Sequence, residues 1–395
     1  MYKGGEIVFL PSLKKYNPCL IDYAVQLHQS GQILPDTYVV DLEAIKKNTK
    51  KMVKVAQENK VELLYMTKQF GRNPVIAKTI EEAGIPLAVI VDFREAETFM
   101  HYGLHLGNVG NLVQMPRSLV KKVLAYGTKY VTVYSMNNLV YINQIAKELK
   151  ITQKIILKVI GNSDELYPGQ VGGLTISEFE SNFTKIVNFS NVELVGITCF
   201  PALLFNDTTN KIEPTTNIKT IEKVRKIFRE NNYPLQVVSL PSATCCNSIP
   251  LIKKLGGNEG EPGHGLSGTT PLHANSRQPE IPAYCYVSEI SHSFKGHSYF
   301  YGGGYYRRGH VHNALVFADN QEYESKVLPF DNENIDYYLE LEDSYTEGAT
   351  VITDFRTQIF VTRSVVAIVD GLQSGKPKLL GLYDSQGKHM PKEIM

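Results

Sequence analysis

The sequence predicts an α/β chain in which a (β/α)8 TIM-type barrel is followed by an all-β C-terminal domain. Between residues 36 and 275, short apolar runs alternate with amphipathic helical stretches, which is typical of a parallel sheet with helical crossovers. After about residue 276 the pattern changes to alternating, β-branched and aromatic runs separated by turn residues. A chain of 395 residues is also too long for one ordinary core.

The first 35 residues predict a helical arm that packs on the body of the protein. Pro11–Gln29 carries apolar residues at helical spacing. The next apolar run, 38–40, is the first of nine strand candidates that precede the β domain, whereas a barrel needs eight. We therefore expect three segments, 1–35, 36–275 and 276–395, with the strand 38–40 shared with the β domain.

The remaining elements follow from periodicity and turn residues. The eight barrel runs end near Lys68, Val91, Gln114, Tyr134, Ile160, Thr198, Leu240 and Glu261. Predicted helices cover 42–58, 75–83, 93–101, 117–125, 137–149, 176–188, 216–231 and 245–255. Strands of the β domain are predicted at 283–290, 298–301, 314–317, 350–355, 358–361, 365–369 and 378–383.

Composition excludes several classes of partner. The formal net charge is only +1, which argues against a nucleic-acid or membrane-surface partner. No apolar run reaches transmembrane length, the N-terminus lacks a secretion signal, and five cysteines form no disulfide or zinc pattern. His310 and His312 share a strand face without a convincing third ligand, so we expect no metal. These features predict a cytoplasmic protein.

Lys68 is the candidate reactive residue. It follows the apolar run 61–66, and Gly71 and Pro74 then break the run, which places Lys68 at the last position of barrel strand one. Barrel active sites lie at the carboxyl ends of the strands. Burial lowers the pKa of an ammonium and makes the lysine a nucleophile, as Schiff-base formation requires. The alternative is a strand-end lysine that reaches water.

Strands seven and eight lead into two turns that suit an anion. Pro241–Thr244 precedes a helix, and Glu261 is followed by Pro-Gly263-His264-Gly. Backbone N–H groups at a helix start and at a glycine-rich turn bind phosphate. Together with Lys68 they describe a pyridoxal 5'-phosphate site, with Lys68 on the aldehyde and Ser242, Gly263 and His264 on the phosphate.

Glu261 strengthens this interpretation. A carboxylate beside the pyridine nitrogen favours the protonated ring, which is a strong electron sink for a carbanion at the substrate's α-carbon. Arg72, four residues after Lys68, is a further phosphate candidate, although a helix-capping role is equally compatible with its position. Tyr383, followed by Asp384, is another phosphate candidate.

Six segments carry a family resemblance through their order and spacing. They are Val40–Asn48, Met66–Lys68, Gly196–Phe200, Pro241–Thr244 with Asn247–Ser248, Glu261–Gly263 and Lys295–Gly303. Over residues 36–390 the chain resembles the alanine-racemase-like (fold-type III) pyridoxal phosphate enzymes, and most closely the YhfX-like group. The resemblance implies a barrel plus a β domain and a head-to-tail homodimer whose active sites are shared between subunits.

The resemblance also implies a second acid/base group. Tyr301 falls where racemases place the tyrosine that a partner subunit contributes, and Tyr305 and Tyr306 are rivals for this role. The alternative is that Tyr301 has a purely structural role, as an aromatic side chain packed in a strand. With a reference pKa of about 10, such a tyrosine needs a cationic neighbour or a hydrogen-bond network to act as a base.

The chain departs from true alanine racemases at three places. Glu261 stands where racemases have an arginine, as in the related decarboxylases, and His264 replaces the arginine of their Glu-Pro-Gly-Arg motif. Cys199 takes the place of a histidine that usually faces the cofactor ring. The segment 167–173, which contains Gln170, replaces one in which racemases use an arginine. These changes leave the fate of the carbanion open.

Arginines of the β domain are candidates for the substrate's carboxylate, because guanidinium binds carboxylate through two hydrogen bonds. Arg307 and Arg356 are the candidates, with Arg308 beside Arg307. For each of them an ordinary surface ion pair is the alternative. We also expect Gln170 near the substrate.

We therefore predict a pyridoxal phosphate-dependent amino-acid racemase, in which Lys68 and Tyr301 of the partner subunit exchange protons on opposite faces. An amino-acid decarboxylase or an aldolase-type lyase of the same fold remains possible, as does a non-catalytic pyridoxal phosphate-binding protein. Decarboxylases of this family usually bring a cysteine–aspartate pair from the β domain, where Cys285 is the only cysteine in residues 281–395. The non-catalytic relatives are usually single barrels.

Overall fold

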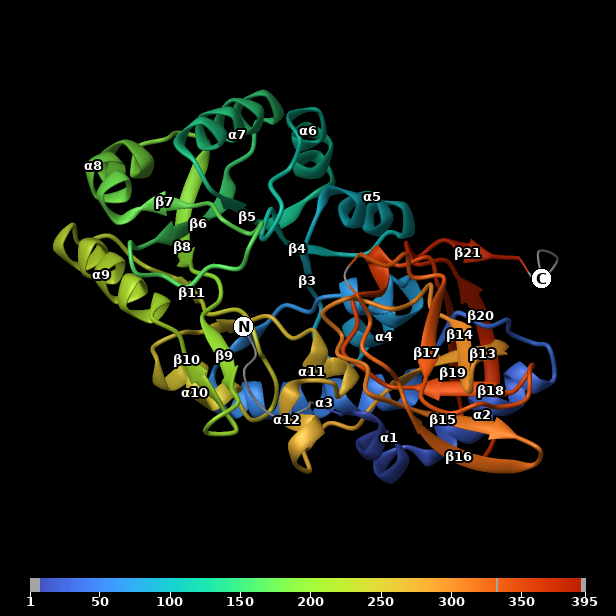
Figure 1. Ribbon diagram of the computed structural model, residues 1–395. Coiled ribbons are helices and arrows are strands. Elements are labelled where there is room, and N and C mark those ends of the chain that lie inside the picture. The colour runs from blue at the N-terminus through green and yellow to red at the C-terminus, as the bar shows by residue number, and fades with distance from the viewer. Residues whose placement is uncertain (1–7, 332, 392–395) are drawn as a thin grey trace.

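Eight parallel strands form a barrel in the first two-thirds of the chain (Figure 1). The computed structural model describes residues 8–331 and 333–391. In spatial order the strands are β2 (Glu62–Leu63), β12 (Glu259–Gly260), β11 (Val237–Ser239), β8 (Val192–Thr198), β6 (Gln153–Ile160), β5 (Thr128–Val133), β4 (Leu106–Val109) and β3 (Ala88–Ile90). A parallel bridge between Tyr65 and Ala88 closes the ring.

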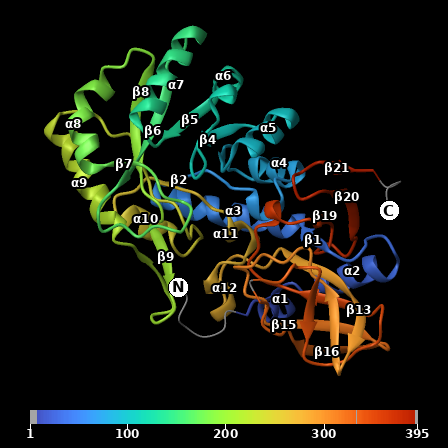
Figure 2. The ribbon, with the colours of Figure 1, turned by 45° about the horizontal axis from the view of Figure 1, so that its top comes forward.

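Amphipathic helices cover the outside of the barrel, and in the chain each of them lies between two successive strands (Figure 2). They are α3 (Leu42–Asn59), α4 (Pro74–Glu82), α5 (Phe93–Tyr102), α6 (Arg117–Tyr126), α7 (Met136–Leu149), α8 (Ile176–Val187), α9 (Asn217–Glu230) and α10 (Ile249–Lys254). Side-chain caps fix several helix starts. For example, the Asp92 side chain accepts a hydrogen bond from the Glu95 N–H at 2.9 Å. This N–H lies in the first turn of α5 and has no acceptor within the helix.

Several short elements lie between or after the main strands and helices of the barrel. The two-residue β7 (Leu174–Thr175) pairs with β6, and an antiparallel hairpin is formed by β9 (Leu203–Asn206) and β10 (Lys211–Pro214). After β12 come two brief helices, α11 (His264–Ser267) and α12 (Pro271–Asn275). These helices and the hairpin lie at the carboxyl ends of the barrel strands.

The C-terminal domain is built on a mixed sheet whose centre includes the first strand of the chain, β1 (Thr37–Asp41). β1 pairs antiparallel with β13 and parallel with β19. The other members are β13 (Tyr284–Phe294), β14 (His297–Tyr301), β15 (Asn313–Ala318), β16 (Gln321–Lys326), β17 (Tyr338–Leu341), β18 (Thr350–Thr353), β19 (Val365–Asp370), β20 (Lys378–Tyr383) and β21 (His389–Met390). The strand count in the sequence assigns 38–40 to this domain, and β1 lies there.

The N-terminal arm packs on one face of this sheet. It is two helices, α1 (Leu10–Tyr16) and α2 (Pro18–Gln29), where the sequence predicts one. Asn17 separates them, because Pro18 cannot continue α1 and instead begins α2. The buried amide of Asn17 donates to Asp41 at 2.9 Å and to the Pro282 carbonyl at 3.0 Å. Each side chain that α2 buries fully, such as Leu20 and Leu27, contributes about 1.5–3 kcal/mol.

Four local predictions are wrong, each for an identifiable reason. The third barrel strand, β4, ends at Val109 and not near Gln114, because Gly110 takes a positive φ of 95°. The helix predicted at 245–255 begins only at Ile249. Residues 359–361 form a 3-10 turn, η2, in place of a strand. The prediction omits strands β16 and β17: charged residues fill alternate positions of β16, and β17 is only four residues long.

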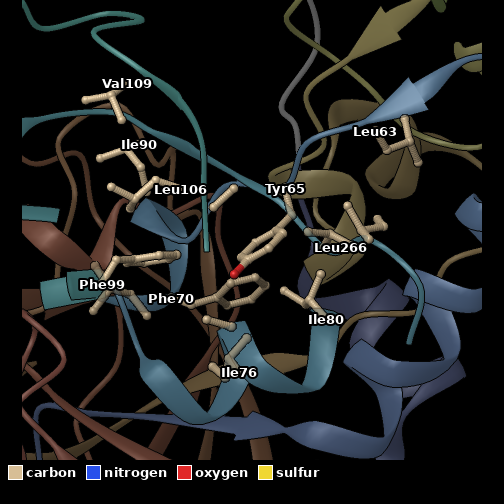
Figure 3. Packing of buried hydrophobic residues seen from close by; sticks show 14 of the residues in the cluster. Leu63, Tyr65, Phe70, Ile76, Ile80, Ile90, Phe99, Leu106, Val109 and Leu266 are labelled. Atoms are coloured by element: carbon tan, nitrogen blue, oxygen red, sulfur yellow. The ribbon is translucent and has the colours of Figure 1, made fainter. Parts of the chain in front are cut away.

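Lys68 is likewise not the last residue of a strand. It begins a 3-10 turn, η1 (Lys68–Phe70), because the Thr67 carbonyl accepts the N–H groups of Phe70 and Arg72. Tyr65 and Phe70, on either side of this turn, are buried in the core between β2–β4 and α4–α5 (Figure 3). The turn that carries Lys68 is therefore anchored at both ends in closely packed apolar surface.

Within the described residues, no helix is both long and apolar enough to span a bilayer.

Candidate active site

A cavity of about 290 Å³ opens at the carboxyl ends of the barrel strands, close to the size range of small-molecule sites. Barrel loops supply one part of its wall and the C-terminal domain of the same chain supplies the other. Its polar lining residues are Lys68, Gln170, Ser242, Thr244, Glu261, His264, Thr270, Arg308, Arg356 and Gln358. Aromatic lining residues are Tyr167, Phe200, Phe205, Tyr306 and Phe360.

The turn that presents Lys68 is fixed by main-chain pairing. Leu64 and Met66 donate their N–H groups to Gly260 and Pro262 of the last barrel strand, at 3.0 and 2.9 Å. Gly71 then takes a φ of 63°, and a Cβ there would lie 3.0 Å from the Ser385 carbonyl oxygen. Glycine therefore allows the turn to pack closely against the C-terminal segment.

Its surroundings lower the pKa of Lys68 to about 8. Burial is the largest cause, and the Arg356 guanidinium adds to it, as does Arg308 more weakly. Glu95 and Glu261 act in the opposite direction. The neutral amine is the nucleophilic form, so a substantial fraction of Lys68 is reactive near neutral pH.

Glu261 is held by an asparagine that the sequence did not identify. The Asn111 amide donates to both carboxyl oxygens, at 2.8 and 3.0 Å. Burial nevertheless raises the pKa of Glu261 to about 7, although Asn111 and Lys68 lower it. The backbone N–H of Glu261 donates to Thr244 at 3.1 Å, which ties the last strand to the loop after strand seven.

The loops after strands seven and eight form a cradle of backbone donors. Ser242 and Ala243 have positive φ values of 90° and 50°. In the described part of the chain, the N–H groups of Ala243, Thr244, Gly263 and His264 donate to no acceptor. Successive backbone donors that converge in this way bind phosphate. The Ser242 hydroxyl is engaged elsewhere, since it bonds to both the N–H and the carbonyl of Leu203.

His264 is a neutral member of the cavity wall. Its pKa lies well below the ordinary value, mainly because of burial and the nearby charges of Arg356 and Lys68. The Gln358 amide donates to Nε2 at 3.2 Å, so Nδ1 carries the proton and donates to Thr269 at 3.3 Å. Its imidazole therefore presents no charge to a ligand.

The arginines of the C-terminal domain divide into two groups. Arg356 and Arg308 line the cavity, and the Arg308 guanidinium lies 5.2 Å from the centre of the Tyr167 ring. Arg307 is not among the lining residues. It donates to the Asn334 carbonyl at 2.7 Å and packs over Phe330.

Five of the residues singled out in the sequence lie away from this cavity. Arg72 binds Asp92 and Gln386, and Cys199 is fully buried behind the wall. The remaining three belong to the C-terminal domain. The Tyr383 ring lies 5.2 Å from that of His389, the Tyr301 ring lies 5.7 Å from that of Tyr338, and Arg307 is described above. Lys68, Gln170, Ser242, Glu261, Gly263, His264 and Arg356 do come together.

Sequence reasoning missed a second buried lysine. Lys158, in β6, donates to the Gln170 carbonyl at 3.2 Å and lies 4.6 Å from the centre of the Tyr134 ring. Burial lowers its pKa to about 8. The only sequence feature that could have identified Lys158 is its position as an isolated lysine within an apolar run. No sequence feature pointed to Thr270 or Asn111.

Comparisons with known proteins agree with this architecture. Residues 40–271 match the family model of the alanine racemase N-terminal domain, and residues 285–379 match that of the YhfX-like C-terminal domain. The protein YhfX of Escherichia coli K12 is 40% identical over 385 residues, which span 97% of this chain and 100% of that protein.

Solved structures with a similar fold share little sequence. An alanine racemase of Clostridium difficile 630 superposes with a TM-score of 0.63 at 15% identity, covering 89% of this chain and 99% of that chain. A diaminopimelate decarboxylase of Helicobacter pylori gives 0.66 at 12%, with 93% and 98% covered. A D-threonine aldolase of Filomicrobium marinum gives 0.64 at 12%, with 89% and 95% covered.

The chain therefore belongs to the alanine-racemase-like (fold-type III) proteins. Within them it is a member of the YhfX-like group, as the C-terminal domain match and the full-length relative show. Proteins of this fold family typically bind pyridoxal phosphate. The residues present fit that group, because a lysine of lowered pKa, a carboxyl group and a cradle of backbone donors line one cavity.

Proposed function

We propose that this protein is a pyridoxal phosphate-dependent amino-acid racemase. The observation that carries the proposal is the meeting of Lys68, with a pKa of about 8, and Glu261 in one cavity. The cofactor, when bound, stabilises negative charge at the α-carbon of an amino acid. Lys68 would hold the cofactor and exchange the α-proton, and Glu261 would keep the ring nitrogen protonated.

The remaining polar residues have binding roles in this proposal. The N–H groups of Ala243, Thr244, Gly263 and His264 would hold the phosphate. Arg356 and Arg308 would bind the substrate's carboxylate, because a guanidinium fork matches a carboxylate. Both lie close enough to Lys68 to lower its pKa. Gln170 would orient the substrate beside them.

The second acid/base group would be Tyr301 of the partner subunit in a head-to-tail homodimer. Tyr301 lies away from the cavity of its own chain, as this arrangement requires. Tyr306 does line that cavity and is the rival within one chain. Mixing Tyr301→Phe with Lys68→Ala subunits separates the two, since shared sites regain about a quarter of wild-type activity in a statistical mixture of dimers. A Tyr306 role instead predicts that Tyr301→Phe subunits are active on their own, so the mixture keeps about half of the wild-type activity.

A lyase of the same fold is the second candidate. Glu261 favours it, because a protonated ring holds the carbanion longer and so allows cleavage at the α-carbon. The structural neighbours include a decarboxylase and an aldolase by their names. Product analysis decides, since racemisation conserves the amino acid whereas a lyase releases carbon dioxide or an aldehyde.

The first experiment is an absorption spectrum of the purified protein, before and after borohydride, beside Lys68→Ala. We expect a visible band that reduction removes and that the variant lacks, with the reduced cofactor attached to Lys68 by mass spectrometry. A protein that shows no band even after pyridoxal phosphate is added would overturn the cofactor assignment. A band without α-proton exchange in deuterated water, for any amino acid of a full panel, would leave a non-catalytic binding protein.

A further inference from the structure

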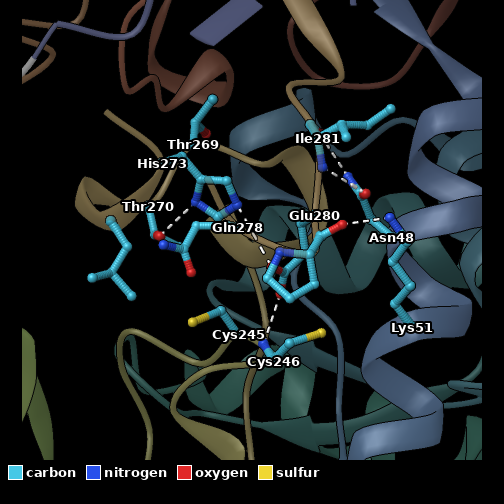
Figure 4. Close-up of polar contacts among 12 residues, drawn as sticks. Asn48, Lys51, Cys245, Cys246, Thr269, Thr270, His273, Gln278, Glu280 and Ile281 are labelled. Carbon is cyan, nitrogen blue, oxygen red and sulfur yellow. Dashed lines mark hydrogen bonds and ion pairs between the residues drawn. The ribbon is translucent and has the colours of Figure 1, made fainter. Parts of the chain in front are cut away.

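A buried polar chain leads from the cavity wall into the protein. Thr270 lines the cavity, and its Oγ1 lies 2.7 Å from Nδ1 of His273 (Figure 4). On the far side of the imidazole, Nε2 lies 3.7 Å from Oε2 of Glu280. The side chains of His273 and Glu280 are 2% and 0% exposed, so both are nine-tenths buried or more.

Glu280 is the charged end of this chain. Burial acts to raise its pKa, but His273 and the Cys246 N–H, which donates to Oε1 at 2.7 Å, lower it by more. Its pKa therefore lies below the ordinary value, and Glu280 is a carboxylate near neutral pH. Within the described chain, neither its Oε2 nor His273 Nε2 has a partner within hydrogen-bond distance, so their 3.7 Å approach to each other is the polar contact of both atoms.

This arrangement fixes the direction of the hydrogen bond at the cavity. In the neutral imidazole, Nε2 faces an anionic oxygen and carries the proton, which leaves Nδ1 as an acceptor. The Thr270 hydroxyl proton is then directed to Nδ1. The lone pairs of Oγ1 remain for the cavity, so Thr270 acts there as a hydrogen-bond acceptor.

An acceptor at this position selects among ligands. It disfavours the phosphate of the cofactor and any carboxylate, because neither has a proton to donate. An ammonium side chain is disfavoured by charge, since Lys68, Arg308 and Arg356 line the same cavity, whose described lining includes a single carboxyl group, Glu261. An uncharged donor fits, and a hydroxyl is the smallest of these.

We propose that the substrate is an amino acid with a hydroxyl group on its side chain, which donates a hydrogen bond to Oγ1 of Thr270. His273 and Glu280 are positioning residues, which direct the Thr270 proton away from the substrate. The inference rests on the proposed function, since it specifies the substrate of that same cavity. A site that hydrogen-bonds a substrate hydroxyl rejects the analogue that lacks it far more strongly than a purely apolar pocket does.

The first test examines the hydrogen-bond chain without any turnover. Nitrogen-15 NMR of histidine-labelled protein, with the His273 signal assigned by its loss in His273→Gln, reports which ring nitrogen is protonated. We expect protonated Nε2 and bare Nδ1, and a shift of this signal in Glu280→Gln. A proton on Nδ1 in the wild type, alone or together with one on Nε2, would overturn the inference.

The second test compares isosteric substrates. Threonine and valine, and serine and 2-aminobutyrate, differ only by hydroxyl against methyl. We expect wild-type kcat/KM for α-proton exchange in deuterated water to favour each hydroxylated member by at least about 100-fold. In Thr270→Val this preference should fall to within about tenfold, mainly through a higher KM for the hydroxylated member. Thr270→Ser should restore it.

Controls separate this inference from the proposed function. Thr49→Val makes the same change at a buried hydroxyl in α3, outside the cavity, and should leave the preference intact. The absorption band of the bound cofactor shows that each variant is folded and loaded. Exchange that ignores the hydroxyl, or a preference that survives in Thr270→Val, would refute the inference alone. Exchange with no amino acid at all would refute the proposed function.

Discussion

Asn111 donates both of its hydrogen bonds to Glu261, one to each carboxyl oxygen, at 2.8 and 3.0 Å. An amide placed in this way stabilises the charged form of a carboxyl group that burial pushes toward neutrality. The two residues come from loops or strands 150 positions apart in the chain. The state of Glu261 is therefore set by tertiary structure and not by its own sequence motif.

Removal of this amide should raise the pKa of Glu261. In the native protein that pKa is about 7. Hydrogen bonds to a charged group contribute about 1.5–3 kcal/mol each, so Asn111→Ala should raise the pKa by about one unit or more. Infrared spectroscopy measures this, because the band of the protonated carboxyl group then persists to higher pH and is absent in Glu261→Gln. Asn108→Ala, which removes a buried amide bonded to Thr132 in β5, should leave the midpoint unchanged.

The reactivity of Lys68 should depend on Arg356. In the cofactor-free protein, labelling of Lys68 by an amine-reactive reagent should increase as pH rises through about 8, the pKa of this lysine. Arg356→Gln removes a neighbouring positive charge, which makes the charged form of Lys68 more stable. The midpoint pH of labelling should therefore move upward, toward 10.5. Arg307→Gln is the matched control and should not shift it. A midpoint that stays near 8 in Arg356→Gln would contradict the electrostatic account.

Glu259 should make the fold more stable at lower pH. Burial, with Glu261 and Glu62 nearby, raises its pKa from 4.5 to about 8. The folded protein thus holds a proton that the unfolded chain releases, so stability falls as pH rises from about 4.5 to about 8. At about 1.4 kcal/mol for each pKa unit, the effect reaches a few kcal/mol.

Glu259→Gln removes this titration. The variant should have a higher free energy of unfolding than the wild type at pH 8, and nearly the same value near pH 5. Urea unfolding at the two pH values measures the difference. Glu230→Gln, on the exposed end of α9, should change neither value by more than about 0.5 kcal/mol. Equal free energies of unfolding for the wild type and Glu259→Gln at pH 8 would show that ionisation of Glu259 does not destabilise the folded protein.

Arg72 should stabilise the fold without contributing to cofactor binding. Its buried guanidinium joins Asp92 and Gln386, and it lies 5.0 Å from the centre of the Phe360 ring. Loss of one partner of a buried ion pair costs about 3–5 kcal/mol, so Arg72→Gln should lower the free energy of unfolding by about 3 kcal/mol. The affinity for pyridoxal phosphate should stay within about threefold of the wild type, less than 1 kcal/mol.

A contrasting ion pair provides the control. Lys226 and Glu230 pair on the exposed surface of α9, and Lys226→Gln should cost about 0.5 kcal/mol or less. If Arg72→Gln instead weakened cofactor binding tenfold or more while leaving urea unfolding unchanged, Arg72 would be a phosphate ligand after all.

The fold was predictable because the barrel repeats one pattern. Each strand–helix unit changes from continuous apolar residues to helical spacing, and the unit ends with a cap or glycine. Eight of these units, with one extra strand, account for most of residues 37–260. Two of the four wrong local predictions lie in the C-terminal domain, where the chain leaves this repeat. Residues 359–361 are apolar like a strand, yet they form a turn that packs against η1 beside Lys68.

The site was predictable to the extent that it lies on strand ends. Lys68, Glu261 and Gly263 lie in the segments that follow barrel strands, so fold class alone brings them together. Arg356 was placed by its chemistry, but the choice of Arg307 over its neighbour Arg308 was not resolved by sequence. Adjacent residues in a loop point in different directions, and a loop has no periodicity from which the direction of each side chain could be predicted.

The position of β1 in the sheet of the C-terminal domain has a consequence for synthesis. Its antiparallel partner begins at Tyr284 and its parallel partner at Val365. The ribosome therefore makes this central strand first and its neighbours last, on the order of half a minute later at ~5–20 residues per second. During that interval both edges of this apolar strand lack their native partners.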